Sequence, residues 1–364
     1  MNRFIFYCIL VNMIANMISA VSKILMDHKK DGIFLSMLLA VLSGMVIVYV
    51  FGKFFSKFPG KDLQTLLEEY TPVWVSKPVL FLTVLHWFIS GVLSIVSYTF
   101  MLKRFLTPEM PITWIATTIL IIISYGILMN TKSVLYTIEN ILLFSLPIVL
   151  YLVFKAYTNR LFEWDFVREA FMYVNTLPTY SSYAAAMFIF LGITNIVVFN
   201  PVFKDPIKMT WKHTLFTGFL GSLVLLTLYL VPIGMNGFER VDHLVYPAIS
   251  TSDTLRMTFG IIERVLYLFL PLFLAISILN LLLHWHVAIE ACKSLFFPKW
   301  LKWRNTNYTP HLYIAVFWVI TLITIKSLSE YSLLQYSKYF YNLIPLSSLF
   351  YFFIFWLIRR RAKT

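Results

Sequence analysis

The sequence predicts an all-α membrane protein with about ten transmembrane helices, and its composition, apolar runs and charge placement support this prediction. Hydrophobic residues make up 59% of the 364 residues, the mean hydropathy is +0.77, and only 13% are charged. A soluble domain carries about 25% charged residues, so a soluble fold could not bury this much apolar surface. The net charge of +13 comes from lysines and arginines in short loops. That placement indicates membrane orientation rather than nucleic-acid binding.

Apolar runs long enough to cross a bilayer recur along the whole chain. A span needs roughly 20 mainly apolar residues. On that basis we expect one transmembrane domain over residues 1–364 with ten spans, at 4–26, 33–55, 78–102, 112–129, 135–154, 181–202, 214–235, 261–290, 311–326 and 339–358. The first twenty residues also resemble a secretory signal peptide. A membrane span is the better interpretation, because the apolar run continues to Met26 and the number of spans is then even.

Basic residues predict on which side of the membrane the termini lie. Arg359, Arg360 and Arg361 directly follow the last span, and basic residues next to span ends stay on the cytoplasmic side. An even number of spans returns the N-terminus to the same side. We therefore expect both termini in the cytoplasm.

Two spans carry polar residues at mid-membrane, where a lipid-facing helix would have leucine and valine. The sixth reads FIFLGITNIVVFNP over residues 188–201, with Gly192, Thr194 and Asn195 at its centre. The first carries Asn12 and Asn16 four residues apart, which places them on one helix face. Small and polar residues also serve as packing contacts between helices, and this explains Gly192 taken alone. Interruptions at matching places in two halves instead indicate a transporter-type binding site, so we expect both helices to be broken around a cavity.

Spans 3 and 8 add polar stripes at helical spacing. In span 3, His86, Ser90, Ser94 and Ser97 recur beside Trp87 and Gly91, and in span 8, Ser277, Asn280 and His284 share one face. An ionisable group inside the membrane is by default a functional-site hypothesis, and His284 is the sharper candidate because Asn280 lies one turn away. The alternative is an ordinary hydrogen bond between helices, worth about 0.6 kcal/mol.

The sequence lacks the patterns of catalysis and of metal or cofactor binding. No His, Cys, Asp or Glu cluster has metal-ligand spacing, no glycine-rich phosphate loop occurs, and no nucleophile lies beside a base. Cys8 and Cys292 fall in different spans and are expected to be core thiols. The chemistry indicated is binding, so we expect neither an enzyme nor a bound metal or cofactor.

Several stretches together resemble a known family. They are FGKFFSKFPGKDLQTLLEEY at residues 51–70, FLGITNIVVFNP in span 6, GFERVDHLVYPAIS at 237–250 and IIERVLYLF at 261–269. On these motifs the chain resembles, nearly end to end, the B subunit of bacterial spore germinant receptors. That subunit is a branch of the amino acid–polyamine–organocation transporter superfamily.

The resemblance implies a fold and a set of pocket residues. The fold would be a five-plus-five inverted repeat, with repeat one at about 1–155, repeat two at about 178–360, and helices 1 and 6 broken at mid-membrane. The pocket would lie among spans 1, 3, 6 and 8 and would use Asn12, Asn16, Trp87, Gly91, Leu191, Gly192, Thr194, Asn195, Asn280 and His284. Two departures concern this pocket. Ala15-Asn16-Met17 stands where relatives often have Gly-x-Gly, and Thr194 stands where many have glutamate.

The function implied is nutrient sensing in the spore inner membrane. The protein would bind a small germinant (an amino acid, sugar or nucleoside) at mid-membrane and signal to partner A and C subunits, with no role for nucleic acid. The first alternative is a secondary transporter that moves an amino acid with protons or sodium. Two others are a membrane-bound transferase, which the missing catalytic groups disfavour, and a transporter-like scaffold that only holds its partners.

Overall fold

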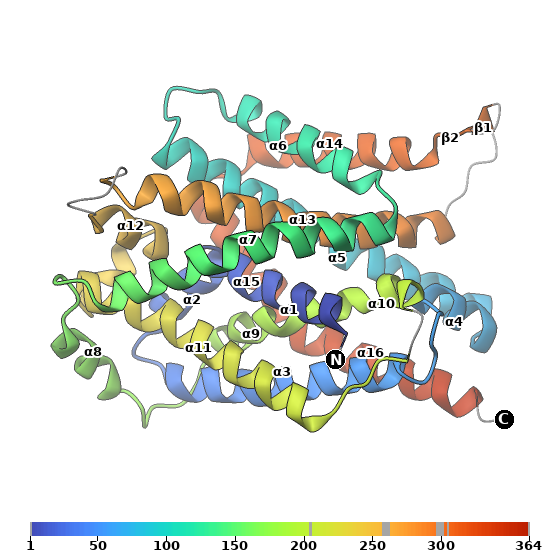
Figure 1. Cartoon of the computed structure of the whole chain (residues 1–364), viewed down its shortest axis with the longest axis horizontal. Helices are drawn as coiled ribbons and strands as arrows, with labels where there is room; N and C mark the ends of the chain where they lie inside the picture. Colours follow the sequence, from blue (N-terminus) through green and yellow to red (C-terminus); the bar gives the residue numbers. More distant parts are fainter. Residues whose placement is uncertain (1, 204–205, 257–262, 296–301, 304–305, 363–364) are drawn as a thin grey trace.

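A computed structural model describes residues 2–203, 206–256, 263–295, 302–303 and 306–362 (Figure 1). The described chain is almost entirely helical, as the absence of water in a bilayer core requires of a spanning backbone. Its longer helices are α1 (Arg3–Ala15), α2 (Ala20–Asp27), α3 (Ile33–Phe55), α5 (Val73–Phe105), α6 (Ile112–Ile127), α7 (Thr131–Tyr157), α9 (Tyr180–Phe188), α11 (Trp211–Asn236), α13 (Leu266–Leu295), α14 (Thr309–Ser327), α15 (Glu330–Asn342) and α16 (Ile344–Arg361).

Shorter elements complete the chain. They are the helices α4 (Leu63–Tyr70), α8 (Trp164–Phe171), α10 (Ile196–Phe199) and α12 (Pro247–Thr254), the 3-10 segments η1 (Ile189–Asn195), η2 (Asn200–Val202) and η3 (Val241–His243), and the paired strands β1 (Lys302–Trp303) and β2 (Thr306–Asn307).

The predicted all-α membrane fold of about ten helices is confirmed. Within the described residues, 8 helices are long and apolar enough to cross a membrane, the bent pair α1–α2 adds one span, and α6 is a shorter apolar helix. Each corresponds to one predicted span. The largest differences from the predicted bounds are at spans 3, 8 and 10. Span 3 begins at Val73, before the predicted position 78. Span 8 runs on to Leu295, and its first predicted positions, 261 and 262, lie outside the described residues. Span 10 begins at Glu330 instead of 339, because two polar helical turns precede its apolar run.

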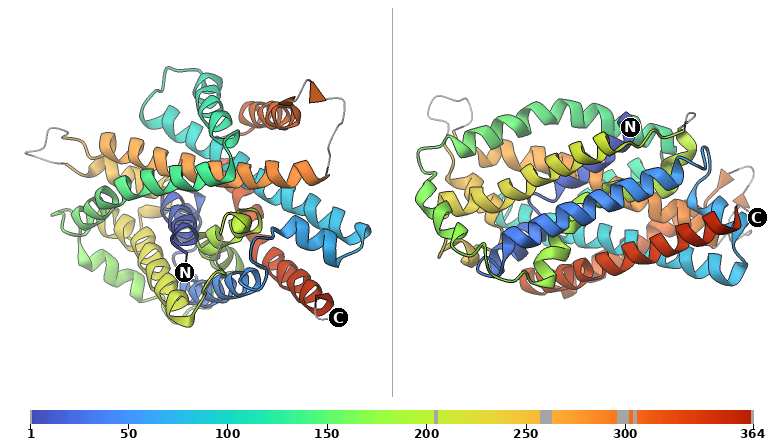
Figure 2. Two further views of the ribbon diagram at one scale, coloured as in Figure 1. Left: turned by 45° about the vertical axis from the view of Figure 1, so that its right-hand side comes forward. Right: turned by 90° about the horizontal axis from the view of Figure 1, so that it is seen from below.

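Helices 1 and 6 lie at the centre of the bundle. Of the most apolar stretch of each spanning helix, span 6 is 89% buried within the protein, against 33% to 61% for the other long helices. Figure 2 shows α1 and the span 6 segments enclosed by the surrounding helices. Outward-facing side chains such as Phe144, Ile323 and Leu346 are exposed and apolar, as contact with lipid requires. The two helices predicted to be broken are therefore the ones shielded from lipid.

The two ends of the bundle differ. One end carries α4, the β1–β2 hairpin and the C-terminus, and we call it the C-terminal end (Figure 1). The other carries α8 and α12, and we call it the opposite end. The division of the chain into two inverted repeats stays a prediction.

Candidate functional site

The first span is interrupted between Ala15 and Ala20, and its two halves are bent by 55° relative to each other. Polar side chains stabilise the break. The side-chain amide of Asn16 donates to the carbonyl oxygen of Asn12 (2.7 Å), and the hydroxyl of Ser19 donates to Oδ1 of Asn16 (2.9 Å). The same hydroxyl accepts from the backbone N–H of Val21 at the start of α2 (3.3 Å). Span 1 thus breaks although Ala15-Asn16-Met17 stands at this place, because Asn16 and Ser19 supply hydrogen bonds that the helix ends lack.

The sixth span changes from α-helix to a 3-10 segment over Ile189–Asn195. Asn12 joins the two breaks, since its Nδ2 donates to the carbonyl oxygens of Phe188 (2.9 Å) and Ile189 (3.0 Å). Within the segment, Thr194 donates to the carbonyl of Leu191 (2.6 Å) and Asn195 donates to that of Gly192 (3.2 Å). A broken helix survives in a membrane only if its backbone groups are bonded. These polar side chains meet that condition.

Gly192 lies where the two broken spans touch. A Cβ atom at this position would lie 2.3 Å from the carbonyl oxygen of Cys8 and 2.5 Å from Cα of Ile9. Both are backbone atoms of α1, so a side chain here could be accommodated only if a helix moved. Gly192 therefore permits close packing of α1 on η1, which is the alternative that the sequence left open for this glycine.

The two predicted pocket residues of span 3, Trp87 and Gly91, pack against spans 6 and 8 respectively. The indole N–H of Trp87 donates to Oδ1 of Asn195 (2.8 Å), which ties α5 to the span 6 break. A Cβ on Gly91 would lie 2.1 Å from Nε1 of Trp285. Gly91 therefore makes room for the Trp285 ring between α5 and α13.

A narrow cavity lies between the broken spans and helices 3, 8 and 10. It has about 20 Å³ open to the centre of a water molecule, which is room for one or two waters. Two of the predicted pocket residues, Asn16 and Asn280, line it, and so do Ser90, Ser94 and Ser97, the three serines of the polar stripe predicted in span 3. The other residues that line it are Ser19, Ala20, Leu93, Tyr98, Phe188, Ser337, Phe340 and Tyr341.

Buried polar atoms without partners gather at this cavity. Among the described residues, Oγ of Ser90 and Oδ1 of Asn280 have no hydrogen-bond partner, although the two residues are only 3% and 4% exposed. Nδ1 of His284, one turn beyond Asn280, also has no hydrogen-bond partner. An unbonded buried polar group costs about 1–3 kcal/mol. A polar molecule that enters the cavity and bonds these atoms would remove that cost, so the atoms indicate a binding site for a polar molecule.

The structure brings together only part of the predicted site. Asn16 and Asn280 meet at the cavity, and His284 adjoins Asn280 without being one of its lining residues. Leu191, Gly192, Thr194 and Asn195 lie in the adjoining break, and Phe188 at its start reaches the cavity. Sequence reasoning missed three cavity residues of span 10: Ser337, Phe340 and Tyr341. Ser337 precedes the predicted span and the two aromatic residues lie at its start. None of them belongs to a polar stripe at mid-membrane, so no sequence signal marked them.

Comparison with known families agrees with this architecture. A family model described as a spore germination protein matches residues 2–331. The chain belongs to the spore germination protein family. This family, which includes the germinant receptor B subunits, is receptor- and transporter-like and is not a family of enzymes. No curated protein matches the chain.

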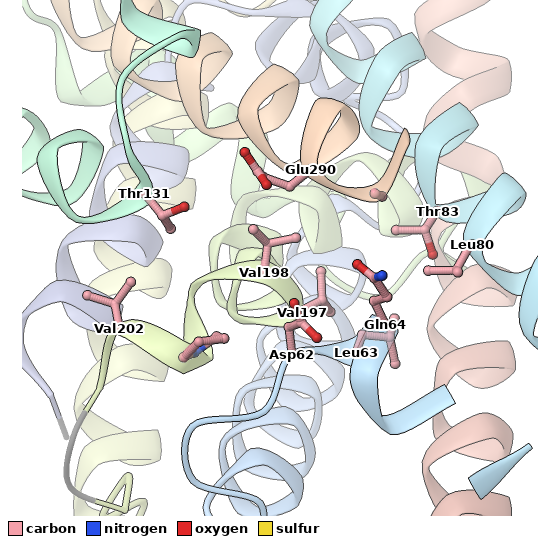
Figure 3. Close-up of a pocket in the computed structure, with 12 residues that line it drawn as sticks. Asp62, Leu63, Gln64, Leu80, Thr83, Thr131, Val197, Val198, Val202 and Glu290 are labelled. Atoms are coloured by element: carbon pink, nitrogen blue, oxygen red, sulfur yellow. The ribbon is translucent and has the colours of Figure 1, made fainter. Parts of the chain in front are cut away.

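The protein has a second and larger cavity at the C-terminal end of the bundle (Figure 3). It opens about 290 Å³ to the centre of a water molecule. Glu290 of α13 and Thr131 of α7 face Asp62 and Gln64 across it, and Val197 of α10 lies between them. The carboxylate of Asp62 accepts the backbone N–H of Thr65 (2.8 Å), and that of Glu290 pairs with Lys293 (2.5 Å). The cavity lies next to the half of span 6 that follows the break.

At the opposite end, charged side chains fasten the first broken span to the loop after α11. Nζ of Lys29, which is 4% exposed, donates to the carbonyl of Phe238 (2.6 Å) and pairs with Asp242 (3.0 Å). Nζ of Lys30 pairs with Glu239 (2.8 Å). This hydrogen bond raises the pKa of Lys30 and lowers the pKa of Glu239. We call Lys29, Lys30, Phe238, Glu239 and Asp242 the latch. It holds the end of α2, and α2 begins beside the cavity.

Proposed function

We propose that this protein is the germinant-binding B subunit of a spore nutrient receptor. It binds a small molecule at mid-membrane, and occupancy shifts an equilibrium between two arrangements of the helices. Partner A and C subunits pass the change on in the spore inner membrane, with both termini of this chain on the spore core side. Family membership supports the link to germination, and Arg359 to Arg361 after the last helix support the orientation.

One observation carries the proposal. The cavity with its unbonded Ser90 and Asn280 atoms lies where two broken helices meet. Its 20 Å³ is far below the roughly 300 Å³ of a small-molecule pocket. A ligand therefore fits only if the helices move. A ligand that binds one arrangement and not the other shifts their balance, and going from 1:99 to 99:1 takes about 5.5 kcal/mol of differential binding. The breaks supply the points at which the helices can move.

Asn280→Ala tests the proposal cleanly. Because Oδ1 of Asn280 has no partner, its removal costs the fold little, whereas it removes a contact to the ligand. Spores with the variant should need about tenfold more nutrient for half-maximal loss of optical density, which is the effect of one lost hydrogen bond at the upper end of its range. Protein abundance, measured by immunoblot, should be normal.

Asn175→Ala is the matched control, since Asn175 is exposed in the loop before α9. Its spores should germinate at the wild-type nutrient concentration. If Asn280→Ala spores have a normal protein level and need no more nutrient than wild-type spores, the sensor function is refuted. The protein would then be a scaffold that only holds its partners.

A secondary transporter is the second candidate, and the cavity at the C-terminal end favours it. Transport needs a path from the central site to the cytoplasmic side, and this cavity adjoins the second half of span 6. Purified protein in proteoliposomes should then accumulate a labelled nutrient down an imposed proton or sodium gradient. If the protein binds a nutrient but does not take it up, the transporter function is refuted and the sensor function is retained.

A further inference from the structure

A further hollow lies on the outside of the bundle, between span 3 (α5), span 9 (α14) and span 10 (α15 and α16). Two adjoining grooves form it, and they open about 310 Å³ and 390 Å³ to the centre of a water molecule. Both are lined by Ile89, Phe340 and Leu343. Along α5 they run from Leu82 to Leu93, which is about 17 Å of helix. We call the two together the outer groove, and it extends over about half of the hydrocarbon core.

His86 of span 3 faces the outer groove, and its imidazole ring lacks a hydrogen bond. Among the described residues, no group donates to this ring or accepts from it. The hydroxyls of Ser347, Thr324 and Tyr351, which also line the groove, are all bonded within the chain. A neutral imidazole has one donor and one acceptor nitrogen. The groove therefore leaves both nitrogens of His86 without a partner.

The depth of His86 determines what could supply such a partner. Its neighbour Trp87 donates to Asn195 in the span 6 break, so His86 lies at the depth of that break, inside the hydrocarbon core. Water and lipid headgroups are absent at this depth, and acyl chains carry no hydrogen-bonding group. Polar side chains inside a membrane pair with other protein groups. A second membrane-spanning helix is therefore the kind of molecule that can bring a hydroxyl or an amide to this place.

The shape of the outer groove argues against a second copy of this chain as the occupant. A two-fold dimer places the same surface patch of each copy against the other. Two concave grooves that face each other would leave a void, whereas a single helix fits into one groove. We propose that the outer groove is the docking site for a membrane-spanning helix of a partner subunit, which bonds His86 through a hydroxyl or amide side chain. The inference rests on the proposed function for the existence of partner subunits, and it names the face that one of them covers.

The wall between the outer groove and the central cavity is one side chain thick. Phe340 lines both hollows. The centre of its ring lies 6.1 Å from that of Phe188, at the start of the span 6 break, and 5.2 Å from that of His86. A ligand that opens the central cavity by moving Phe340 changes the surface that the docked helix contacts. Occupancy of the cavity can thus reach the partner through a single aromatic side chain.

Photo-cross-linking in membranes that contain the whole receptor tests where the partner lies. Leu343→p-benzoylphenylalanine places the cross-linker in the groove, and Leu215→p-benzoylphenylalanine on α11 is the matched control, since the two leucines are 57% and 58% exposed. Immunoblots for the A and C subunits identify the products. We expect the Leu343 variant to form an adduct with one of these subunits and the Leu215 variant to form none. Adducts of the Leu343 variant with a second copy of this chain alone, or with no protein, would overturn the inference. Equal adducts from both positions would overturn it as well.

His86→Leu tests the hydrogen bond to the partner. Titration of the purified chain with the partner subunit measures the apparent dissociation constant, which should rise about threefold, the effect of one average hydrogen bond between membrane helices. His86→Gln keeps a donor and an acceptor and should restore the affinity. Because the ring has no hydrogen bond within the described part of the chain, the isolated chain should unfold at the wild-type temperature in both variants. Wild-type affinity in His86→Leu would refute the role of His86.

Leu343→Trp keeps the docking site testable if the His86 variants fail to fold. Leu343 is exposed, so a larger side chain fills the groove without disturbing the core. The affinity for the partner subunit should fall at least about tenfold, and Leu215→Trp should bind like wild type. If receptors with Leu343→Trp retain their partner subunits and their spores germinate normally, the docking site is refuted. The proposed function would still stand or fall by the nutrient threshold of Asn280→Ala spores.

Discussion

The link that Asn12 makes between the two broken spans can be measured by removing it. Nδ2 of Asn12 is the donor to the carbonyl oxygens of Phe188 and Ile189, and Asn12 is fully buried. In Asn12→Ala these carbonyls lose a partner in a region without water. Hydrogen bonds between membrane helices average about 0.6 kcal/mol with a maximum near 1.7, and an unbonded buried group costs about 1–3 kcal/mol.

For two such bonds we expect Asn12→Ala to lower the free energy of unfolding by about 2–4 kcal/mol. Equilibrium unfolding of the purified protein in mixed micelles, followed by far-UV circular dichroism, measures the change. Ser43→Ala is the control, because the Ser43 hydroxyl bonds only to carbonyls of its own helix α3. A loss below about 0.5 kcal/mol in Asn12→Ala, similar to the control, would refute the view that this side chain holds the breaks together.

Two further predictions concern the contacts around the site. Gly192→Ala should destabilise the protein by about 1–3 kcal/mol, the range for overpacking, because the new Cβ would lie 2.3 Å from the α1 backbone. The same unfolding assay measures this change. An unchanged free energy of unfolding would mean that α1 can move to accommodate the side chain. Lys30→Glu should lower the unfolding temperature by placing like charges together, and the double variant Lys30→Glu/Glu239→Lys should restore it at low salt, with the differences vanishing at high salt. Since the pairing lowers the pKa of Glu239 and raises that of Lys30, its contribution should be constant from about pH 5 to 10, fall as acid protonates Glu239 and fall again as alkali deprotonates Lys30. Loss of the contribution near pH 7 would show that another group titrates there.

The latch also contains Glu239, a residue of a sequence motif whose contact partner could not be read from the sequence. Glu239 stood out in the sequence only as part of GFERVDHLVYPAIS. In the structure it pairs with Lys30, which is 209 positions away along the chain. Spacing along a single helix predicts neighbours three or four residues apart, so it could not reveal this partner.

The sequence by itself determined the membrane class, the places of the ten spans and the identity of the two broken helices. Hydropathy has this power because a bilayer leaves the backbone few alternatives to a spanning helix. The asparagines at mid-membrane marked the breaks for the same reason, since polar groups are costly there unless they are bonded. Asn16 and Asn280 could be placed at the cavity because each lies on a polar face of its own helix.

Only the tertiary structure decided what each marked residue contacts. Gly192 packs against Cys8 and Ile9 of α1, and Trp87 donates to Asn195. The wall formed by span 10 and the unbonded state of Ser90 and Asn280 arise from contacts between helices far apart in the sequence. Periodicity gives the direction of a side chain relative to its own helix. Which helix lies on that side, and how closely, is set by the packing of the whole bundle.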